Sequence, residues 1–327
     1  MDGQNLHFEN RIDLEKLQNA VLKIRQEIHK IIIGQDEFID FLIIGLLSDG
    51  HVLIEGVPGI AKTLTARLLA KTIDTGFSRI QFTPDLMPSD IIGTSVLNMQ
   101  TTKFEFRPGP VFSNIVLIDE INRAPAKTQS ALFEVMEERQ VTVDGNTYQM
   151  ENPFMILSTQ NPIEQEGTYK LPEAQLDRFL FKINVDYPDL EEEIEIIKTH
   201  HERKGKKALT IVDPILSQAE ILEYKVKVHE IIVEEKIIKY IAEIINKTRN
   251  HPHLYLGASP RASIVVLNTS KANAAINGRD FVMPEDVKRV LKPVLRHRLI
   301  MTPEKEMEGF STDKIIDMII QSLEIPR

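Results

Sequence analysis

The chain has 327 residues, of which 42% are hydrophobic and 27% are charged, and these proportions are typical of a soluble globular protein with one or two domains. Its formal net charge of −9 argues against a non-specific nucleic-acid binder. The absence of cysteine excludes disulfides, cysteine-type zinc sites and thiol nucleophiles. The first residues do not resemble a signal peptide, and no apolar run is long enough to span a bilayer, so we expect a cytoplasmic protein.

Two helices are predicted before the first strand. Apolar residues at three- and four-residue spacing predict a helix from residue 13 to about residue 32, and the break at 33–36 precedes a second helix that ends at Leu47. An apolar strand at 51–55 and a helical pattern that begins at Leu64 then flank a short loop. The loop reads Gly56-Val57-Pro58-Gly59-Ile60-Ala61-Lys62-Thr63.

A strand, a glycine-containing loop, Lys-Thr and a helix form the context that a phosphate-binding loop requires. The backbone N–H groups of such a loop face phosphate oxygens, and the following helix adds its positive N-terminal end. Lys62 is expected to reach the β- and γ-phosphates, and Thr63 to hold Mg²⁺. Ala61 departs from the general pattern, which has glycine at that position, so an ordinary strand–turn–helix corner is the alternative.

Further strands alternate with helices along the next part of the chain. A strand is predicted at 79–82, apolar strands are predicted at 115–120 and 154–161, a further strand is predicted at 179–183, and a helix is predicted at 126–139. Near-continuous apolar strands that alternate with helices indicate an α/β fold with a parallel sheet covered on both faces. Two β-hairpins interrupt this plan, one at about 94–108 and one at 140–148 with an Asp-Gly turn.

The pattern becomes entirely helical after Pro188. We therefore predict an α/β nucleotide-binding core over residues 1–187 and a helical lid domain over residues 188–327. The predicted helices of the lid span 191–203, 217–224, 234–250, 260–276, 284–291 and 312–323, and Ser259 followed by Pro260 is a good helix start.

Two acidic residues, Asp119 and Glu120, end the second apolar strand. A parallel sheet places its functional groups at the carboxyl ends of its strands. We expect Asp119 to hold the metal and Glu120 to polarise the attacking water. The alternative is a pair of solvated acids at a strand end.

The chain resembles the MoxR family of AAA+ ATPases, and Ala61 before the lysine is similar to that family's own form of the phosphate loop. The resemblance begins near Ile33 and is dense from 50 to 182. Besides the loop, it rests on QFTPDLMPSD at 81–90, LIDEINRA at 117–124, STQNPIEQEGTY at 158–169 and LPEAQLDRF at 171–179.

The resemblance implies an Mg²⁺-dependent ATPase that works as a ring of six subunits or a similar ring. Asn161 occupies the sensor 1 position, Arg178 the position of the arginine finger that acts on the neighbouring subunit's ATP, and Arg261 the sensor 2 position on a lid helix. Ile33 and Gly34 resemble the segment that packs on adenine. The alternatives are a turn-forming Asn161, a surface ion pair for Arg178, and a simple helix break at Ile33-Gly34.

The two hairpins resemble the inserts that mark this branch of AAA+ proteins, one in helix 2 and one before the sensor 1 strand, and both are expected to project toward a central pore. Phe104, Phe106 and Tyr148 either contact a client protein or pack the hairpins together. The family resemblance implies a chaperone-like role in the maturation or activation of partner proteins, often with a von Willebrand A-type partner.

Other functions remain open from the sequence. A metal-chelatase motor subunit has the same hairpin inserts, and binding of a chelatase partner would distinguish it. A nucleic-acid motor is disfavoured by the acidic balance, and a GTPase by the lack of an acid in Asn246-Lys247-Thr248-Arg249. A scaffold that binds nucleotide without hydrolysis is disfavoured because every expected catalytic position is filled.

Overall fold

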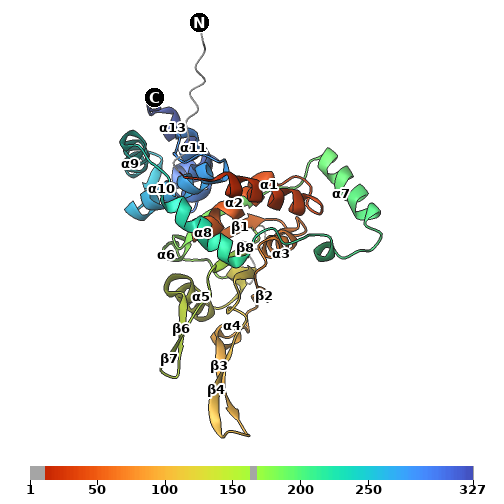
Figure 1. Cartoon of the computed structure of the whole chain (residues 1–327). Coiled ribbons are helices and arrows are strands. Elements are labelled where there is room, and N and C mark those ends of the chain that lie inside the picture. Colours follow the sequence, from red (N-terminus) through yellow and green to blue (C-terminus); the bar gives the residue numbers. More distant parts are fainter. Residues whose placement is uncertain (1–11, 163–167, 327) are drawn as a thin grey trace.

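A five-stranded parallel sheet forms the centre of the N-terminal part of the chain (Figure 1). The computed structural model describes residues 12–162 and 168–326. The order of the strands across the sheet is β2 (Phe77–Gln81), β5 (Ile115–Asp119), β8 (Met155–Gln160), β1 (His51–Gly56) and β9 (Phe179–Val185). The predicted α/β core with a parallel sheet is therefore confirmed.

Burial of the strands explains their apolar sequences. Val52 and Ile54 of β1 belong to one hydrophobic cluster, whereas Leu53 between them belongs to a second cluster on the other face. Neighbouring residues of a strand point to opposite faces, so a strand covered on both sides has to be apolar throughout. The first cluster packs under α1, α2, α3 and lid helices, and the second packs under α4 and α5.

Helices of the α/β part cover both faces of the sheet. The predicted helix at 13–32 is the shorter α1, and α4 and α6 were not predicted. These helices are α1 (Glu15–His29), α2 (Asp36–Leu47), α3 (Lys62–Thr72), α4 (Pro88–Ile92), α5 (Ala126–Glu138) and α6 (Glu173–Leu176), with a 3₁₀ turn at Ile121–Arg123.

Both predicted hairpins are present and extend from the same side of the sheet (Figure 1). The hairpin of β3 (Gly93–Asn98) and β4 (Lys103–Pro108) lies between α4 and β5. The hairpin of β6 (Gln140–Val143) and β7 (Asn146–Gln149) lies between α5 and β8, and its turn residues Asp144 and Gly145 have φ values of 51° and 80°. Two successive positive φ values identify the turn type that Asp-Gly favours.

The C-terminal part is helical, as predicted, except for a small two-stranded sheet of β10 and β11 that the sequence pattern did not indicate. Ser259 is the N-cap residue of α10, but its side chain makes no capping hydrogen bond. The elements are α7 (Leu190–Glu202), a 3₁₀ turn (Ala208–Thr210), α8 (Gln218–His229), α9 (Glu235–Arg249), β10 (Leu254–Leu256), α10 (Pro260–Ile276), α11 (Pro284–Leu295), β11 (Ile300–Met301), α12 (Pro303–Met307) and α13 (Thr312–Gln321).

The predicted boundary at Pro188 lies between β9 and α7, where the chain leaves the sheet. The first hydrophobic cluster continues across it, because residues of α8 to α11 and α13 join those of α1, α2 and the sheet. Asp40 of α2 accepts hydrogen bonds from Arg25 of α1, at 2.6 Å, and from Arg289 of α11. The two parts of the chain share one hydrophobic cluster. The division into domains at 1–187 and 188–327 therefore stays a prediction.

The segment Arg296-His297-Arg298, which follows α11, connects the helical part to the sheet through hydrogen bonds and an ion pair. Arg298 is 8% exposed and pairs with Asp177 at 2.7 Å, and it also donates to the carbonyl of Phe179 at 2.6 Å. A buried guanidinium with several acceptors is costly to remove, because the acceptors then stay buried without partners. No helix in the described part of the chain is both long and apolar enough to cross a membrane.

One buried histidine makes the stability of the fold depend on pH. His51 opens β1, contacts the carbonyl of Met136 through Nε2 at 3.0 Å and accepts from the N–H of Ile156 through Nδ1 at 3.0 Å. Burial lowers the pKa of His51 from its ordinary value of 6.5 to about 4. The folded chain therefore holds His51 neutral at pH values where the unfolded chain protonates it.

We expect this histidine to cost stability as the pH falls below 6.5, with the loss complete near pH 4. Between about pH 7.5 and about pH 5, the free energy of unfolding should fall by about 2 kcal/mol on account of His51 alone. Urea unfolding of the wild type and His51→Asn at both pH values isolates this part. An equal fall in both proteins would contradict the assignment.

Candidate active site

The phosphate loop predicted at 56–63 connects β1 to α3. Ala61 is the N-cap residue of α3 and adopts a left-handed conformation with φ 62° and ψ 16°. This conformation costs an alanine about 1 kcal/mol relative to the usual helical region, so the departure from glycine is a real local strain. Gly59, with φ 91°, has open space where a side chain would begin. The loop thus turns sharply at two points, and Lys62 becomes the first residue of the helix.

The Lys62 side chain folds back over the loop. Its Nζ atom donates to the carbonyl oxygens of Gly56 at 2.5 Å and Val57 at 3.2 Å. Burial lowers the pKa of Lys62, and the nearby carboxylates of Asp119 and Glu120 oppose that shift. An ammonium group that burial destabilises gains from an anionic partner, which a nucleotide phosphate would supply.

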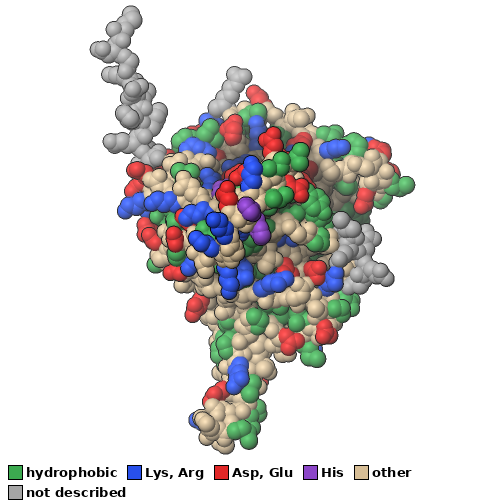
Figure 2. Space-filling model, turned by 90° about the vertical axis from the view of Figure 1, so that its right-hand side faces the viewer, with side chains coloured by type: hydrophobic (Ala, Val, Ile, Leu, Met, Phe, Trp, Pro, Cys, Tyr) green, Lys and Arg blue, Asp and Glu red, His purple; other side chains and the backbone are tan. Residues whose placement is uncertain are grey.

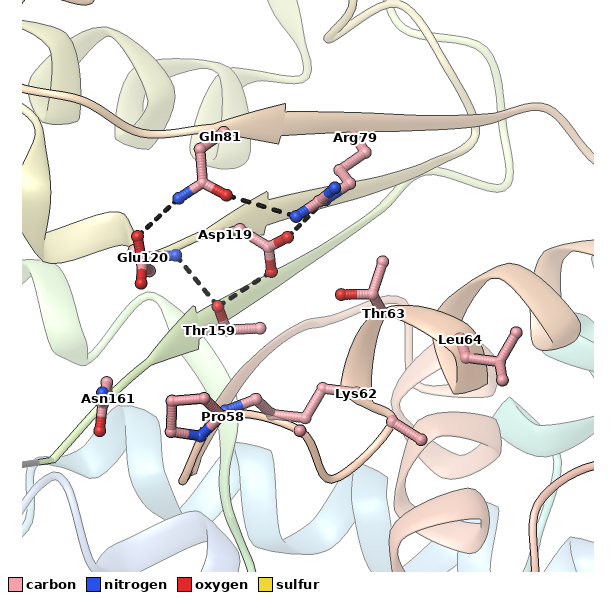
Figure 3. A pocket seen from close by; sticks show the side chains of 12 residues that line it. Pro58, Lys62, Thr63, Leu64, Arg79, Gln81, Asp119, Glu120, Thr159 and Asn161 are labelled. Carbon is pink, nitrogen blue, oxygen red and sulfur yellow. Dashed lines mark hydrogen bonds and ion pairs between the residues drawn. The ribbon is translucent and has the colours of Figure 1, made fainter.

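Asp119 and Glu120 stand at the carboxyl end of β5, next to the end of β8. Thr159 of β8 connects them, because its Oγ1 donates to Asp119 Oδ1 at 3.1 Å and accepts from the N–H of Glu120 at 3.0 Å (Figure 3). Asp119 is 7% exposed, and Glu120 has a left-handed backbone with φ 57°. The two acids are therefore held by the sheet and are not freely solvated.

Two residues of β2 that sequence reasoning missed hold these acids (Figure 3). Arg79 Nε pairs with Asp119 Oδ2 at 2.5 Å, and Gln81 Nε2 donates to Glu120 Oε2 at 2.6 Å. Gln81 lies directly opposite Asp119 in the register of β2 with β5. The available signal was the alternation of polar Arg79 and Gln81 along β2, but the sequence does not say that β2 lies beside β5.

These groups surround one cavity of about 360 Å³ (Figure 3). Nine of its lining residues are predicted site residues, and Arg79, Gln81 and Thr159 are additions. The predicted residues that line it are Pro58, Gly59, Ala61, Lys62, Thr63, Leu64, Asp119, Glu120 and Asn161. Asn161, which directly follows β8, is 8% exposed. The structure therefore brings together the loop, the two acids and the sensor-position asparagine.

The oxygen atoms at this cavity fit a magnesium ion. Thr63 contributes a hydroxyl group and Asp119 a carboxylate, and both line the cavity. In the described residues, no three His, Cys, Asp or Glu side chains form a metal-binding group. Mg²⁺ usually has only one or two protein ligands and completes its shell with phosphates and water, so this sparse donor set suits it.

A second cavity, of about 380 Å³, shares the loop as a wall. Ile33 and Gln35 line it, together with Ile60 of the loop and with Tyr187. Gly34, between Ile33 and Gln35, has φ 65°, and a side chain there would meet the carboxylate of Glu192. Apolar side chains beside a phosphate loop suit the base of a nucleotide, and Ile33 is among them, whereas Gly34 does not line this cavity.

Arg178 and Arg261 lie outside both cavities. Arg178 Nη1 donates to the carbonyl of Phe133 at 2.5 Å and pairs with Glu137 Oε2 at 2.8 Å. Arg261 Nη1 lies 4.0 Å from Glu137 Oε1. Arg261, the residue at the sensor 2 position, therefore lies beside Arg178 at Glu137.

Comparisons with known proteins agree with this geometry. Residues 51–181 match the model of the ATPase family associated with various cellular activities (AAA), and residues 246–319 match an AAA lid domain. Chaperone MoxR1 of Mycobacterium tuberculosis is 45% identical over 328 residues, which cover 96% of this chain and 84% of that protein. The chain belongs to the MoxR family of AAA+ ATPases.

Two further relatives share nearly the whole length of this MoxR-family chain. Protein YeaC of Bacillus subtilis is 43% identical over 312 residues, which cover 95% of this chain and 97% of that protein. A crystal structure from Cytophaga hutchinsonii has a TM-score of 0.89 and 44% identity, and it covers 96% of this chain and 97% of its own. Membership of the MoxR family supports nucleotide binding and ATPase activity in general.

The aromatic residues of the two hairpins in this MoxR-family chain differ in their contacts and exposure. Phe106 of β4 stacks on Tyr148 of β7 with ring centroids 4.2 Å apart, so this pair packs the two hairpins together. Phe104 and Met99 are 74% and 81% exposed. Figure 2 shows the β3–β4 hairpin extending from the body with hydrophobic side chains on its surface. Of the three aromatic residues predicted at the hairpins, Phe104 alone has a largely exposed side chain.

Proposed function

We propose that the chain is an Mg²⁺-dependent ATPase that works as a hexameric or similar ring and remodels partner proteins. The observation that carries this proposal is the separation of its functional groups. Lys62, Thr63 and Asp119 line one cavity, whereas Arg178 and Arg261 lie at Glu137 outside that cavity. A ring of identical subunits joins two such different surfaces at every interface, so each site receives its arginines from the neighbour.

The residues of the cavity divide the work of hydrolysis. Lys62 and the N–H groups of the loop would bind the phosphates, and Ile33 would border the base, with Gly34 setting the turn beside it. Mg²⁺, bound by Thr63 and Asp119, would neutralise charge on the phosphate oxygens. Glu120 is the proposed base for the attacking water, and Asn161 orients that water or the γ-phosphate.

Arg178 and Arg261 would bring positive charge to the transferred phosphoryl group, since Arg79, which lines the cavity, is paired with Asp119. Charge develops on the transferred phosphoryl group in the transition state, and a guanidinium placed there stabilises it. Because Arg178 and Arg261 share Glu137, they would enter the neighbouring site together. Both residues stay proposed site residues, with Arg261 assigned to the neighbour's nucleotide and not to its own.

The remodelling role rests on the family and on the hairpins. The relative named Chaperone MoxR1 supports an action on client proteins, and the exposed Phe104 supports contact through the β3–β4 hairpin. We extend the proposal to a von Willebrand A-type partner, as the resemblance implies. An ATP-driven motor needs a compartment that contains ATP, and the cytoplasm is the proposed one.

The dependence of activity on protein concentration tests the shared site. ATP hydrolysis per subunit should rise with concentration over about a hundredfold range and reach a plateau where sedimentation shows the assembled ring. The rise follows because an isolated subunit has no neighbour to supply Arg178. A rate per subunit that stays constant down to concentrations at which the chain is monomeric would contradict the proposal.

A further inference from the structure

Glu137 connects two arginines that come from distant parts of the chain. It lies in the last turn of α5, whereas Arg178 directly precedes β9 and Arg261 lies in the first turn of α10. Glu137 Oε2 is 2.8 Å from Arg178 Nη1, and Oε1 is 4.0 Å from Arg261 Nη1. The two oxygens of one carboxylate thus face one guanidinium from the core and one from the lid.

The carboxylate of Glu137 offsets the electrostatic repulsion between the two guanidinium groups. Two guanidinium groups are always charged at physiological pH, and bringing them together costs free energy unless an anion lies between them. The side chain of Glu137 is 41% exposed, and those of Arg178 and Arg261 are 29% and 52% exposed. Because all three are partly open to solvent, the carboxylate orients the arginines without burying them.

The contacts of Arg178 leave part of its guanidinium for another partner. Within the described residues, its contacts to Phe133 and Glu137 both use Nη1. The guanidinium also borders a cavity of about 220 Å³ along α5. A planar group fixed at one nitrogen keeps a defined orientation and presents its other N–H groups, which is the geometry that phosphate recognition needs.

Glu137 differs from its neighbour Glu134 on the same helix in its contacts with the two arginines. Glu134, one turn earlier, is exposed and lines the same cavity. Among the described residues, however, Glu134 makes no ion pair with either arginine. Glu134 therefore provides a matched control, because it has the same charge, helix and cavity without the bridging contact.

We infer that Glu137 is a positioning residue that holds Arg178 and Arg261 as one cationic pair for the active site of the neighbouring subunit. The inference rests on the proposed function, because it requires the arginines to act across an interface. It assigns to Glu137 an effect on hydrolysis by the neighbour and none on nucleotide binding by its own subunit.

The first test compares Glu137→Gln with Glu134→Gln. Glutamine keeps the length of the side chain but removes the charge between the arginines, so kcat should fall about tenfold in Glu137→Gln. The KM for ATP and the affinity for a fluorescent ATP analogue should change by no more than about twofold, because the cavity is intact. Glu134→Gln should resemble the wild type. Equal kcat values in both variants, or a higher kcat in Glu137→Gln, would overturn the inference.

The second test places the defect in the donating subunit. Glu137→Gln has an intact cavity, and Glu120→Gln has intact arginines. In a ring mixed at equal amounts, about a quarter of the sites combine an intact cavity with intact arginines. The mixture should therefore reach about a quarter of the wild-type rate. If each subunit used its own arginines, only the Glu137→Gln half would hydrolyse ATP, at about a tenth of the normal rate, and the mixture would reach about one twentieth.

The mixture of Arg178→Ala with Glu120→Gln separates the two possible failures. If this reference mixture regains activity and the Glu137→Gln mixture does not, the role of Glu137 is wrong and the shared site stands. If neither mixture regains activity, the shared site itself is wrong, and the inference fails with it. Recovery in both mixtures supports both.

Discussion

Replacing Glu120 with glutamine is expected to lower the steady-state rate of ATP hydrolysis at least about a hundredfold. Glu120 lines the cavity beside Asn161 and is held by Gln81 at 2.6 Å. Glutamine has the same shape but cannot take a proton from water, so the loss falls on the chemical step. Nucleotide affinity should stay within about twofold of the wild type, because the phosphate loop is unchanged.

Phosphate release and binding of a fluorescent ATP analogue measure these two quantities separately. Glu151→Gln makes the same substitution at an exposed position before β8 and should leave both unchanged. A Glu120→Gln protein that hydrolyses ATP at the wild-type rate would show that another group activates the water. Loss of nucleotide binding in that variant would instead show that Glu120 supports the fold of the cavity.

Replacing Arg178 with alanine should reduce hydrolysis about a thousandfold and leave nucleotide binding by the same subunit nearly unchanged. Arg178 does not line the nucleotide cavity of its own chain, so its effect requires a neighbour. Arg178→Lys keeps the charge but not the planar set of donors, and it should recover only a small part of the rate.

The control for this substitution is Arg107→Ala, which removes an exposed arginine from β4 and should hydrolyse ATP at the wild-type rate. Weakened nucleotide binding in Arg178→Ala, together with normal hydrolysis at saturating ATP, would contradict the role of Arg178 as a catalytic group. It would place the arginine on its own subunit's nucleotide instead.

Local sequence patterns were enough to predict the phosphate loop and the apolar strands. Short-range chemistry determines both: a glycine-containing loop before Lys62 can turn, and a strand such as β5 is apolar because both of its faces are buried. The Asp-Gly turn of the second hairpin was predictable for the same reason, because its two positive φ values suit those residues.

Features that depend on tertiary neighbours were not predictable in this way. Arg79 and Gln81 contact Asp119 and Glu120 only because β2 pairs with β5. The sequence of a single strand does not determine which strands lie beside it in the sheet. The position of Arg261 beside Glu137 depends on how the lid packs against the core. Motif resemblance identified Arg261 as a candidate, but it did not predict its contact with Glu137.

The central claim is that each active site is built from two subunits, and a titration of two inactive variants tests it most directly. Arg178→Ala and Glu120→Gln are mixed at ratios from one pure variant to the other, at constant total protein, and ATP hydrolysis is measured. We predict a rate that rises from near zero to a maximum of about a quarter of the wild type at equal amounts and then falls again. A rate that stays near zero at every ratio, in mixtures shown to form mixed rings, would contradict the account.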